Sequence, residues 1–600
     1  MRRLSYSQIQ GELNAERMAA LPPFRIAVLR NVVIEPIEPY LRYLAYHVGS
    51  NLRCEFSEYD NVFQEAVGGH KGILNEHVEC VLVFIKLDNL SWDLARRFAS
   101  LPPERIEGEK ERIKAFIVSV LTGIRNQTAA LILWSGFELP IHPSLGIVDY
   151  QQKSGQTACV TELNQFLRDA LQAHKNAYVL DLNVCLARVG SKNFYDPRYW
   201  HIGKAPYSRE ALEEISNEVF KYIRPLKGRN KKCLVLDCDN VLWGGIVGEE
   251  GLGGIKLGRT YPGSAYYEFQ QEILNLYHRG VVLALCSKNN AEDVWEVFRQ
   301  HPDMLLRKDH IAAAQLNWGD KVTNLRQIAA DLNLGLDSFV FLDDSPFEVG
   351  QVRQYLPEVE VVQLPLDRAV EYRDIVAAGG WFDTLTISEE DKQRGAMYRA
   401  EAARKELHMQ SQDLESYYSS LEMVLEIRFA DQFSIPRIAQ LTQKTNQFTL
   451  TTRRYSDAQI QELSQSESAD VIYLQLKDRF GESGLTGVCI LKYDGDRALI
   501  DSFLLSCRVL GRGVEDAFLI QCMNRAKWRG CASAIGEYRP TAKNDQVKDF
   551  YSKRNFKPVA TVNGTGCFEL DLAAFEETEP PFFKRIDSNL VKSRAEERDA

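Results

Sequence analysis

Two aspartates, Asp237 and Asp239, stand two residues apart and directly follow the apolar run at residues 233–236. If this run is a strand of a parallel sheet, both carboxylates lie at the carboxyl edge of that sheet, where open α/β folds build their sites. One carboxylate can then attack phosphorus while the other moves a proton. The spacing therefore predicts a centre for phosphoryl transfer.

Further polar side chains follow this pair, either at the ends of apolar runs or, for Lys321, after a stretch that we expect to be helical. In chain order they are Ser287, Lys288, Lys321, Asp343 and Asp344. A phosphoryl group in transfer carries dispersed negative charge, so the reaction requires a nucleophile, cations and hydrogen-bond donors. The set supplies all of them. The alternative, that each acid is a solvated strand end or a helix cap, accounts for single residues but not for their order.

The ordered set resembles the haloacid-dehalogenase superfamily of phosphotransferases, which often has Thr where Val241 stands here. The resemblance implies that Asp237 is a nucleophile that forms an aspartyl phosphate and that Asp239 is the general acid and base. The residues expected to bind phosphoryl oxygens are Ser287, Lys288 and Lys321. The expected ligands of Mg²⁺, a hard ion that prefers oxygen, are Asp237, Asp239 through its backbone carbonyl, Asp343 and Asp344.

A second motif, Arg508-Val-Leu-Gly511-Arg512-Gly513, lies between an expected strand and an expected helix. Glycines before a helix bring backbone N–H groups close together, which favours an anion. The alternative is a plain helix cap next to core aromatic residues. Cys507 precedes the motif; an unbonded cysteine is usually a buried apolar residue, but an arginine and a helix start would favour its thiolate. Both interpretations of Cys507 stay open.

Together with residues 544–556, this motif resembles the second half of the acetyltransferase (GNAT) fold. The resemblance implies that the glycine loop holds the phosphate of coenzyme A or of a phosphopantetheine arm and that Tyr551 protonates the leaving thiolate. The residues expected to bind the arm are Arg508, Gly511, Arg512, Gly513 and Asn544. Cys507 is a candidate for carrying the acyl group.

The presence of both centres in one chain resembles the FkbH-like family of glyceryl-carrier-protein synthases. The sequence motifs that carry the resemblance are at residues 237–248, 441–448, 451–455 and 506–514. This resemblance covers about residues 230 to 565. It implies transfer of a glyceryl unit from 1,3-bisphosphoglycerate to the phosphopantetheine thiol of an acyl carrier protein, with loss of phosphate, for polyketide-type biosynthesis. Asn446, Gln447 and Arg453 are expected to bind the polar substrate, or else to form a structural turn network. A plain phosphatase, a loader of a related acid such as lactate, and a non-catalytic scaffold are the alternatives.

The chain is expected to be an α/β protein of three domains. They are a degenerate SGNH-hydrolase-like domain at 1–226, a haloacid-dehalogenase-like domain at 227–383, and at 384–600 a connector helix, a GNAT-like domain and a charged tail that is loose after Phe583. The first domain resembles its fold in strand pattern and at residues 196–208, but Asn31 follows its first strand where a hydrolase has its nucleophilic serine. We therefore expect scaffolding or docking of the carrier protein there, and a His201 that is packed or hydrogen-bonded rather than a catalytic base.

Composition limits the class of protein. The 600 residues are 45% hydrophobic and 26% charged, with a net charge of -10, which argues against general affinity for nucleic acid or for an anionic membrane. The twelve cysteines show no CxxC pair, and neither a signal peptide nor an apolar run of roughly 20 residues is present. These features predict a cytoplasmic protein with free thiols.

Overall fold

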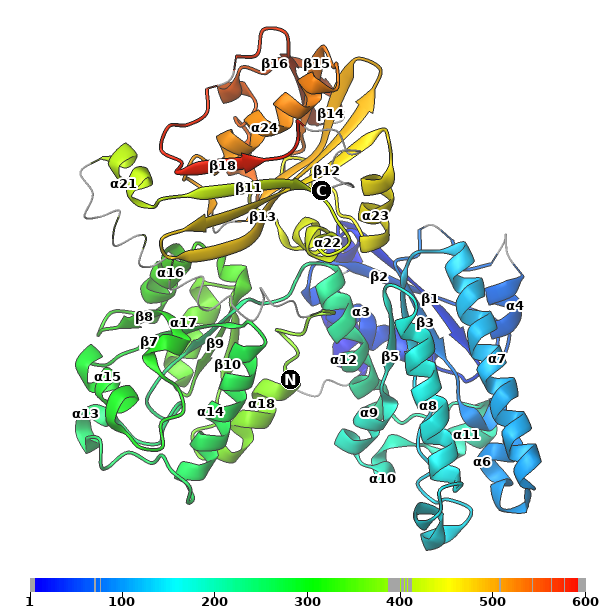
Figure 1. Cartoon of the computed structure of the whole chain (residues 1–600). Coiled ribbons are helices and arrows are strands. Elements are labelled where there is room, and N and C mark those ends of the chain that lie inside the picture. The colour runs from blue at the N-terminus through cyan, green and yellow to red at the C-terminus, as the bar shows by residue number, and fades with distance from the viewer. Residues whose placement is uncertain are drawn as a thin grey trace. The chain divides into compact units, whose positions relative to one another are not determined.

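A computed structural model describes residues 6–13, 15–68, 72–75, 77–386, 400, 404, 407, 413–506, 509–541, 543–562, 564–576 and 578–591. This part of the chain forms three sheets, each with its own buried apolar residues (Figure 1). Residue contacts divide the chain into two compact units, Met1–Lys227 and Gly228–Ala600. The first unit contains one sheet and the second contains two.

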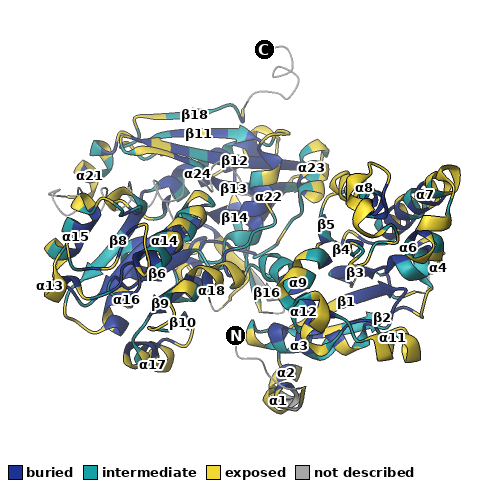
Figure 2. Ribbon diagram, turned by 90° about the horizontal axis from the view of Figure 1, so that it is seen from below, coloured by how far each residue is buried: buried dark blue, intermediate teal, exposed yellow. Residues whose placement is uncertain are grey.

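The first unit is built on a parallel sheet of five strands in the order β2-β1-β3-β4-β5. The strands are β1 Pro23–Arg30, β2 Asn51–Phe56, β3 Cys80–Phe84, β4 Leu131–Ser135 and β5 Ala177–Leu180. Successive residues of β1 enter different cores, Ile26 and Val28 on one face and Ala27 and Leu29 on the other. Helices therefore cover both faces, and Figure 2 shows β1 and β3 dark blue between helices with yellow outer sides.

The helices of this unit divide between the two faces. The first face packs on α3 Glu38–His47, α9 Leu182–Val189 and α12 Arg209–Leu226, and the second on α4 Val62–Val67, α7 Pro103–Gln127 and α8 Gln156–Gln172. Shorter helices are α1 Tyr6–Glu12, α2 Ala15–Ala19, α5 Leu87–Leu90, α6 Trp92–Arg96, α10 Ser191–Phe194 and α11 Pro197–Gly203. The predicted parallel α/β arrangement is confirmed for this region.

The second sheet is also parallel, with the order β10-β9-β6-β7-β8. Its strands are β6 Cys233–Leu236, β7 Val282–Ser287, β8 Ile311–Leu316, β9 Phe339–Asp343 and β10 Glu360–Gln363. Its helices are α13 Val247–Glu250, α14 Gly263–His278, α15 Ala291–Gln300, α16 Lys321–Leu332, α17 Pro346–Tyr355 and α18 Tyr372–Ala378. Cores containing α14, α15 and α18 on one face, and α16 and α17 on the other, bury β6, β7 and β9 on both sides. The carboxyl ends of these central strands meet at one edge.

One local prediction in this domain is wrong. The stretch before Lys321, expected to be helical, is the strand β8, and Lys321 instead begins α16.

The third sheet is mixed and has the order β16-β17-β15-β14-β13-β12-β11-β18. Its strands are β11 Val424–Phe429, β12 Ala469–Asp478, β13 Gly481–Asp494, β14 Arg497–Leu505, β15 Ser533–Tyr538, β16 Lys557–Val562, β17 Thr565–Asp571 and β18 Arg585–Ser588. Its helices are α21 Leu414–Ser420, α22 Ile435–Lys444, α23 Asp457–Gln465 and α24 Val514–Trp528. The parallel pairing of β14 with β15 ends at Ile500 and Gly536, although both strands continue.

Two expectations at the ends of this domain need comment. The tail is not loose directly after Phe583, because β18 pairs in parallel with β11. Most of the expected connector helix at residues 385–420 lies outside the described residues, as do residues 592–600.

The cysteines of the described residues are all free, as predicted. No helix in this part of the chain has the length and apolar character needed to cross a lipid bilayer.

Candidate active site

The carboxyl edge of the second sheet brings a cation between two carboxylates. Nζ of Lys321, the first residue of α16, lies 2.8 Å from Oδ2 of Asp237 and 2.5 Å from Oδ2 of Asp343. Asp237 directly follows β6, and Asp343 ends the neighbouring strand β9. All three residues are buried. The parallel register of the two strands therefore places both acids against one ammonium group.

Asp344 completes a group of three carboxylates. One oxygen of each of Asp237, Asp343 and Asp344 lies within 4.8 Å of the others. Burial, and then the charge of Asp237, raise the pKa values of Asp343 and Asp344 above their ordinary value. For Lys321, burial opposes the positive charge, but Asp237 and Asp343 outweigh it and raise the pKa. Three acids facing one ammonium leave negative charge to be neutralised, and oxygen donors fit a hard divalent cation such as Mg²⁺.

Both carboxylate oxygens of Asp239 accept hydrogen bonds. Oδ1 accepts from the indole Nε1 of Trp243 at 2.8 Å and from the backbone N–H of Val247 at 3.1 Å. Oδ2 accepts from Nδ2 of Asn289 at 2.9 Å. Burial raises the pKa of Asp239, while these hydrogen bonds oppose the shift. A carboxyl group with a raised pKa at this place can donate a proton and later accept one.

Of the two residues expected to bind phosphate after β7, one lies at the site and one is turned to a different partner. Ser287 is buried at the end of β7, and its Oγ accepts a hydrogen bond from Nδ2 of Asn289 at 3.1 Å. Nζ of Lys288 instead lies 2.7 Å from Oε1 of Glu348, on α17. Lys288 is therefore engaged in a local ion pair, contrary to the expectation from the sequence.

Two residues of this site were not singled out from the sequence, Trp243 and Asn289. Both stand within the motifs that were recognised, four residues after Asp239 and two residues after Ser287. Their side chains can donate hydrogen bonds, which could have marked them as candidates for the site. Spacing alone, however, does not show which carboxylate they contact.

The glycine loop before α24 has the backbone that only glycine adopts easily. Gly511 and Gly513 have φ values of 71° and 69°, and Gly513 caps α24 without a side-chain hydrogen bond. A Cβ atom on Gly513 would lie 2.6 Å from Cζ of Phe582. Cys507 and Arg508, which precede this loop, lie outside the described residues.

Two residues expected to bind the arm have structural contacts instead. Nη1 of Arg512 lies 3.4 Å from Oδ2 of the buried Asp478, which also forms a bidentate pair with Arg404. The amide of Asn544 donates to the backbone oxygens of Thr449 and Arg539 at 2.9 and 3.0 Å. Since both side chains are buried, they stabilise the domain rather than face a ligand.

Tyr551 is buried in the same core, and its hydroxyl has no hydrogen-bond partner among the described residues. Its ring lies against Gly536, where a Cβ atom would be 2.3 Å from Cζ of the tyrosine. Burial raises the pKa of Tyr551 well above its ordinary value, so the phenol stays protonated. An unsatisfied buried hydroxyl is costly, and a bound group that accepts a hydrogen bond from it would relieve that cost.

Some of the residues expected to bind substrate form contacts within the domain, as in the alternative of a structural turn network. Nη1 of Arg453 lies 2.5 Å from Oδ1 of Asp501, and Nη2 lies 2.8 Å from Oε2 of Glu537. Oδ1 of Asn446 accepts from Nη2 of Arg454 at 2.8 Å. Gln447 is half-buried. The guanidinium of Arg453 is therefore neutralised within the domain.

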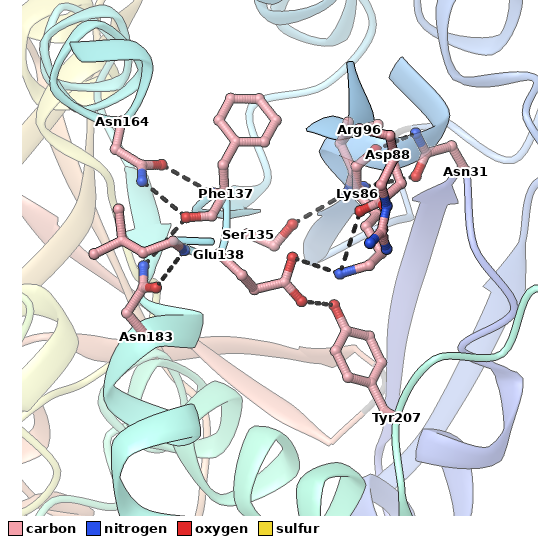
Figure 3. A network of polar contacts seen from close by, with 12 residues as sticks. Asn31, Lys86, Asp88, Arg96, Ser135, Phe137, Glu138, Asn164, Asn183 and Tyr207 are labelled. Carbon is pink, nitrogen blue, oxygen red and sulfur yellow. Dashed lines mark hydrogen bonds and ion pairs between the residues drawn. The ribbon is translucent and has the colours of Figure 1, made fainter. Parts of the chain in front are cut away.

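In the first unit, a polar network occupies the carboxyl ends of the strands (Figure 3). Asn31, which directly follows β1, accepts from the backbone N–H of Lys86 at 2.7 Å and donates to its carbonyl at 3.1 Å. Glu138 accepts from Nζ of Lys86 at 3.1 Å and from the hydroxyl of Tyr207 at 2.8 Å. His201 is exposed on α11, so the expectation that it is packed is wrong. The contacts of Asn31 are those of a structural residue.

Comparison with known proteins gives an extensive structural similarity. No protein-family model matches the chain, and no curated protein matches its sequence. The N-terminal part of the protein BF1531 from Bacteroides fragilis, containing a phosphatase domain complexed with Mg, is 26% identical, with a TM-score of 0.57. The match covers 64% of this chain and 100% of that chain.

Shorter matches are with N-acetyltransferases. The ribosomal-protein-S18-alanine N-acetyltransferase from Escherichia coli is 16% identical and covers 26% of this chain and 98% of its own, with a TM-score of 0.20. PaiA N-acetyltransferase from Thermoplasma acidophilum, in complex with coenzyme A, is 17% identical over 24% of this chain and 98% of its own, with a TM-score of 0.19.

Proposed function

We propose that this chain is an Mg²⁺-dependent enzyme that couples a phosphatase to an acyl transfer. It takes a glyceryl unit from 1,3-bisphosphoglycerate, removes phosphate, and loads the unit on the phosphopantetheine thiol of an acyl carrier protein. The observation that carries the proposal is the ammonium of Lys321 between Asp237 and Asp343, with Asp239 held beside them. The similarity to an Mg-complexed phosphatase domain supports the first half.

In the phosphatase half, a carboxylate oxygen of Asp237 attacks the phosphorus of the phosphate ester. The bond from phosphorus to the ester oxygen breaks, and Asp239 gives its proton to the departing alkoxide. Water then attacks the aspartyl phosphate, Asp239 takes a proton from that water, and inorganic phosphate leaves while Asp237 is restored. Lys321 and Ser287 supply a charge and a hydroxyl for the phosphoryl oxygens.

Asp237, Asp343 and Asp344 are the residues that would hold Mg²⁺, because their carboxylate oxygens converge, and burial followed by the charge of Asp237 raises the pKa values of Asp343 and Asp344. When bound, the ion supplies positive charge that stabilises the phosphoryl oxygens.

In the acyl-transfer half, the chemistry of the substrate assigns the two phosphates. One is a mixed anhydride with the carboxyl group, and only this bond can drive thioester formation; the other is a simple ester. Asp237 therefore takes the ester phosphate, and a thiolate attacks the acyl carbon and expels the anhydride phosphate. The thiolate belongs either to Cys507, which passes the acyl group on, or directly to the carrier arm. The glycine loop before α24 would hold the phosphate of the arm.

Two features of the third sheet support a thiol ligand in that domain. The pairing of β14 with β15 stops while both strands continue, and the hydroxyl of Tyr551 is buried without a partner. In a relay through Cys507, the phenol of Tyr551 would protonate the thiolate that leaves when the acyl group moves to the arm.

The alternatives are a phosphatase without acyl transfer, a loader of a related acid such as a lactyl unit, and a scaffold that only binds the carrier protein. The buried charges argue against the scaffold, because burying Lys321 with several carboxylates is costly and a binding module does not need it. Asp237 and Lys321 thus favour an enzyme.

The test is incubation of the full-length protein with Mg²⁺, 1,3-bisphosphoglycerate and a phosphopantetheinylated carrier protein, followed by intact-mass spectrometry of the carrier. We expect a mass increase of one glyceryl group without phosphate. Asp237→Asn should leave the phosphate on any transferred acyl group. An unmodified carrier together with release of phosphate would favour the plain phosphatase. The absence of both a modified carrier and released phosphate would contradict the proposal. Normal loading by Cys507→Ser would exclude the covalent relay and leave direct attack by the arm.

A further inference from the structure

The carboxylate of Asp239 receives hydrogen bonds from two side chains that come from different segments of the second sheet's domain. Trp243 belongs to the loop after β6, and Asn289 to the loop after β7. We propose that Trp243 and Asn289 are positioning residues that fix the carboxyl group of Asp239 for proton transfer to the leaving group. The inference rests on the phosphatase half of the proposed function.

The three contacts restrain both oxygens of Asp239. The indole of Trp243 and the backbone N–H of Val247 share Oδ1, while Asn289 alone holds Oδ2. A carboxylate with donors on both oxygens cannot rotate about its Cβ–Cγ bond without breaking a buried hydrogen bond. The geometry of the acid is therefore set before a substrate binds.

The indole donor is itself held in place. Trp243 is fully buried and packs edge-to-face on Phe298, with ring centroids 6.5 Å apart. Asn240 has a φ of 55°, and its Oδ1 accepts from the backbone N–H of Gly245 at 2.9 Å, which fixes the turn on either side of Trp243. Val241, between Asp239 and Trp243, is buried and has no side-chain donor. The indole is thus the side-chain donor that this loop offers to Asp239.

Asn289 has a second function in the same geometry. Its Nδ2 donates to Oδ2 of Asp239 and also lies 3.1 Å from Oγ of Ser287. One amide nitrogen therefore links the proton-transfer residue to a hydroxyl expected to bind the phosphoryl group. With Asn289 buried at 4% exposure, water cannot readily replace this link. Removal of the amide should loosen the acid relative to the phosphoryl group.

This function makes a prediction that depends on the leaving group. An alkyl alkoxide needs a proton as the ester bond breaks, whereas nitrophenolate leaves without one. A residue that positions Asp239 should therefore be important for alkyl phosphates and nearly dispensable for p-nitrophenyl phosphate. A residue that merely supports the fold, or that helps to bind the phosphoryl group, should affect both substrates alike.

The experiment compares Asn289→Ala and Trp243→Phe with wild type in the full-length protein with Mg²⁺, using p-nitrophenyl phosphate and glycerol 3-phosphate. Since general acid catalysis contributes roughly 10²–10⁴-fold, kcat/KM for glycerol 3-phosphate should fall by about 10- to 100-fold in each variant. For p-nitrophenyl phosphate it should fall less than about 3-fold, because that leaving group needs little help from a general acid. Asn290→Ala is the matched control, because Asn290 contacts Trp318 and Asp293 instead, and both substrates should be unaffected.

Equal losses on the two substrates, or no loss on glycerol 3-phosphate, would overturn the inference while leaving the phosphatase in place. Wild-type protein without activity on either substrate would overturn the proposed phosphatase and this inference with it. Trp243→Phe keeps an aromatic ring at this buried position and removes the N–H donor with part of the indole, so its effect on the two substrates tests the same idea if Asn289→Ala fails to fold.

Discussion

Lys321 and Asp237 form a buried ion pair, with 2.8 Å between Nζ and Oδ2, that joins the start of α16 to the end of β6. Burial of the ammonium is offset by this carboxylate, because Asp237 and Asp343 together raise the pKa of Lys321. The same ammonium also contacts Asp343, so a single cation organises the ends of two neighbouring strands.

Replacing Lys321 should cost both stability and activity. Lys321→Met leaves two buried carboxylates without their cation, which should lower the free energy of unfolding by about 3–5 kcal/mol in EDTA. Phosphatase activity should fall by about 10²–10³-fold, because a charge that stabilises the transferring phosphoryl group is lost. Urea unfolding, monitored by hydrogen exchange of α16, measures the loss of stability. Lys288→Met breaks the ion pair between the half-exposed Lys288 and Glu348 and should cost less than about 1 kcal/mol. Equal losses in the two variants would contradict the prediction.

Magnesium should stabilise this domain through the three carboxylates. At a free Mg²⁺ concentration 100 times Kd, binding adds about 2.7 kcal/mol to the folded state, so Tm should rise on addition of the ion. Differential scanning calorimetry with and without EDTA measures this shift. Asp344→Ala should abolish most of it, whereas Asp374→Ala, at an exposed position on α18, should retain it. An undiminished shift in Asp344→Ala would place the ion elsewhere.

The strands that carry the candidate site were predictable because they are central. β6, β7 and β9 are buried on both faces and read as continuous apolar runs, which parallel sheets require. Edge strands such as β10 have partly exposed residues and give a weaker signal. β8 has the sequence Ile-Ala-Ala-Ala-Gln-Leu, in which alanine favours a helix, but pairing with β7 imposes a strand.

The contacts of individual side chains were less predictable than the motifs. The position of Lys321 could be inferred from the order of charged residues, but the partner of Arg512 could not. That partner, Asp478, is 34 residues earlier in the chain, at the end of β12, whereas Arg512 lies in the loop before α24, so the two meet only when the third sheet forms. A sequence pattern shows that a cation is present, whereas tertiary packing decides whether it faces a ligand.

The network of Asp478 with Arg404 and Arg512 should be a large source of stability in the third domain. Asp478→Asn removes a buried carboxylate charge that two buried guanidinium groups share and should cost about 3–5 kcal/mol. Hydrogen exchange of β12 peptides under increasing urea measures this loss. Glu482→Gln is the matched control on the adjacent strand, because its pair with Lys477 is exposed and should contribute less than about 1 kcal/mol. Loss of the same size in both variants would contradict the assignment of Arg512 to this network.

Asp149 should stabilise α8 in a pH-dependent manner. Its Oδ1 accepts from the backbone N–H of Gln156 at 2.7 Å and its Oδ2 from that of Thr157 at 3.0 Å, at the start of a helix whose own N-cap, Gly155, offers no side chain. Burial opposes the charge, but the contacts with Thr157 and Gln156 outweigh it and hold the pKa of Asp149 below its ordinary value of 3.8. A carboxylate with a lowered pKa stabilises the folded state above the unfolded value and loses this effect as the pH falls through the folded value.

Asp149→Ala should therefore weaken α8 by about 0.5–2 kcal/mol at pH 7, the usual cost of removing a helix cap. The difference from wild type should shrink as the pH falls below 3.8, because protonation removes the same charge from the wild-type side chain. Hydrogen exchange of α8 peptides in the full-length protein, compared between variants at each pH, measures the effect. Asp169→Ala, an exposed position near the other end of the helix, should show no such loss at either pH. A constant difference for Asp149→Ala from pH 7 to pH 3 would mean that packing, rather than the carboxylate charge, holds the start of α8.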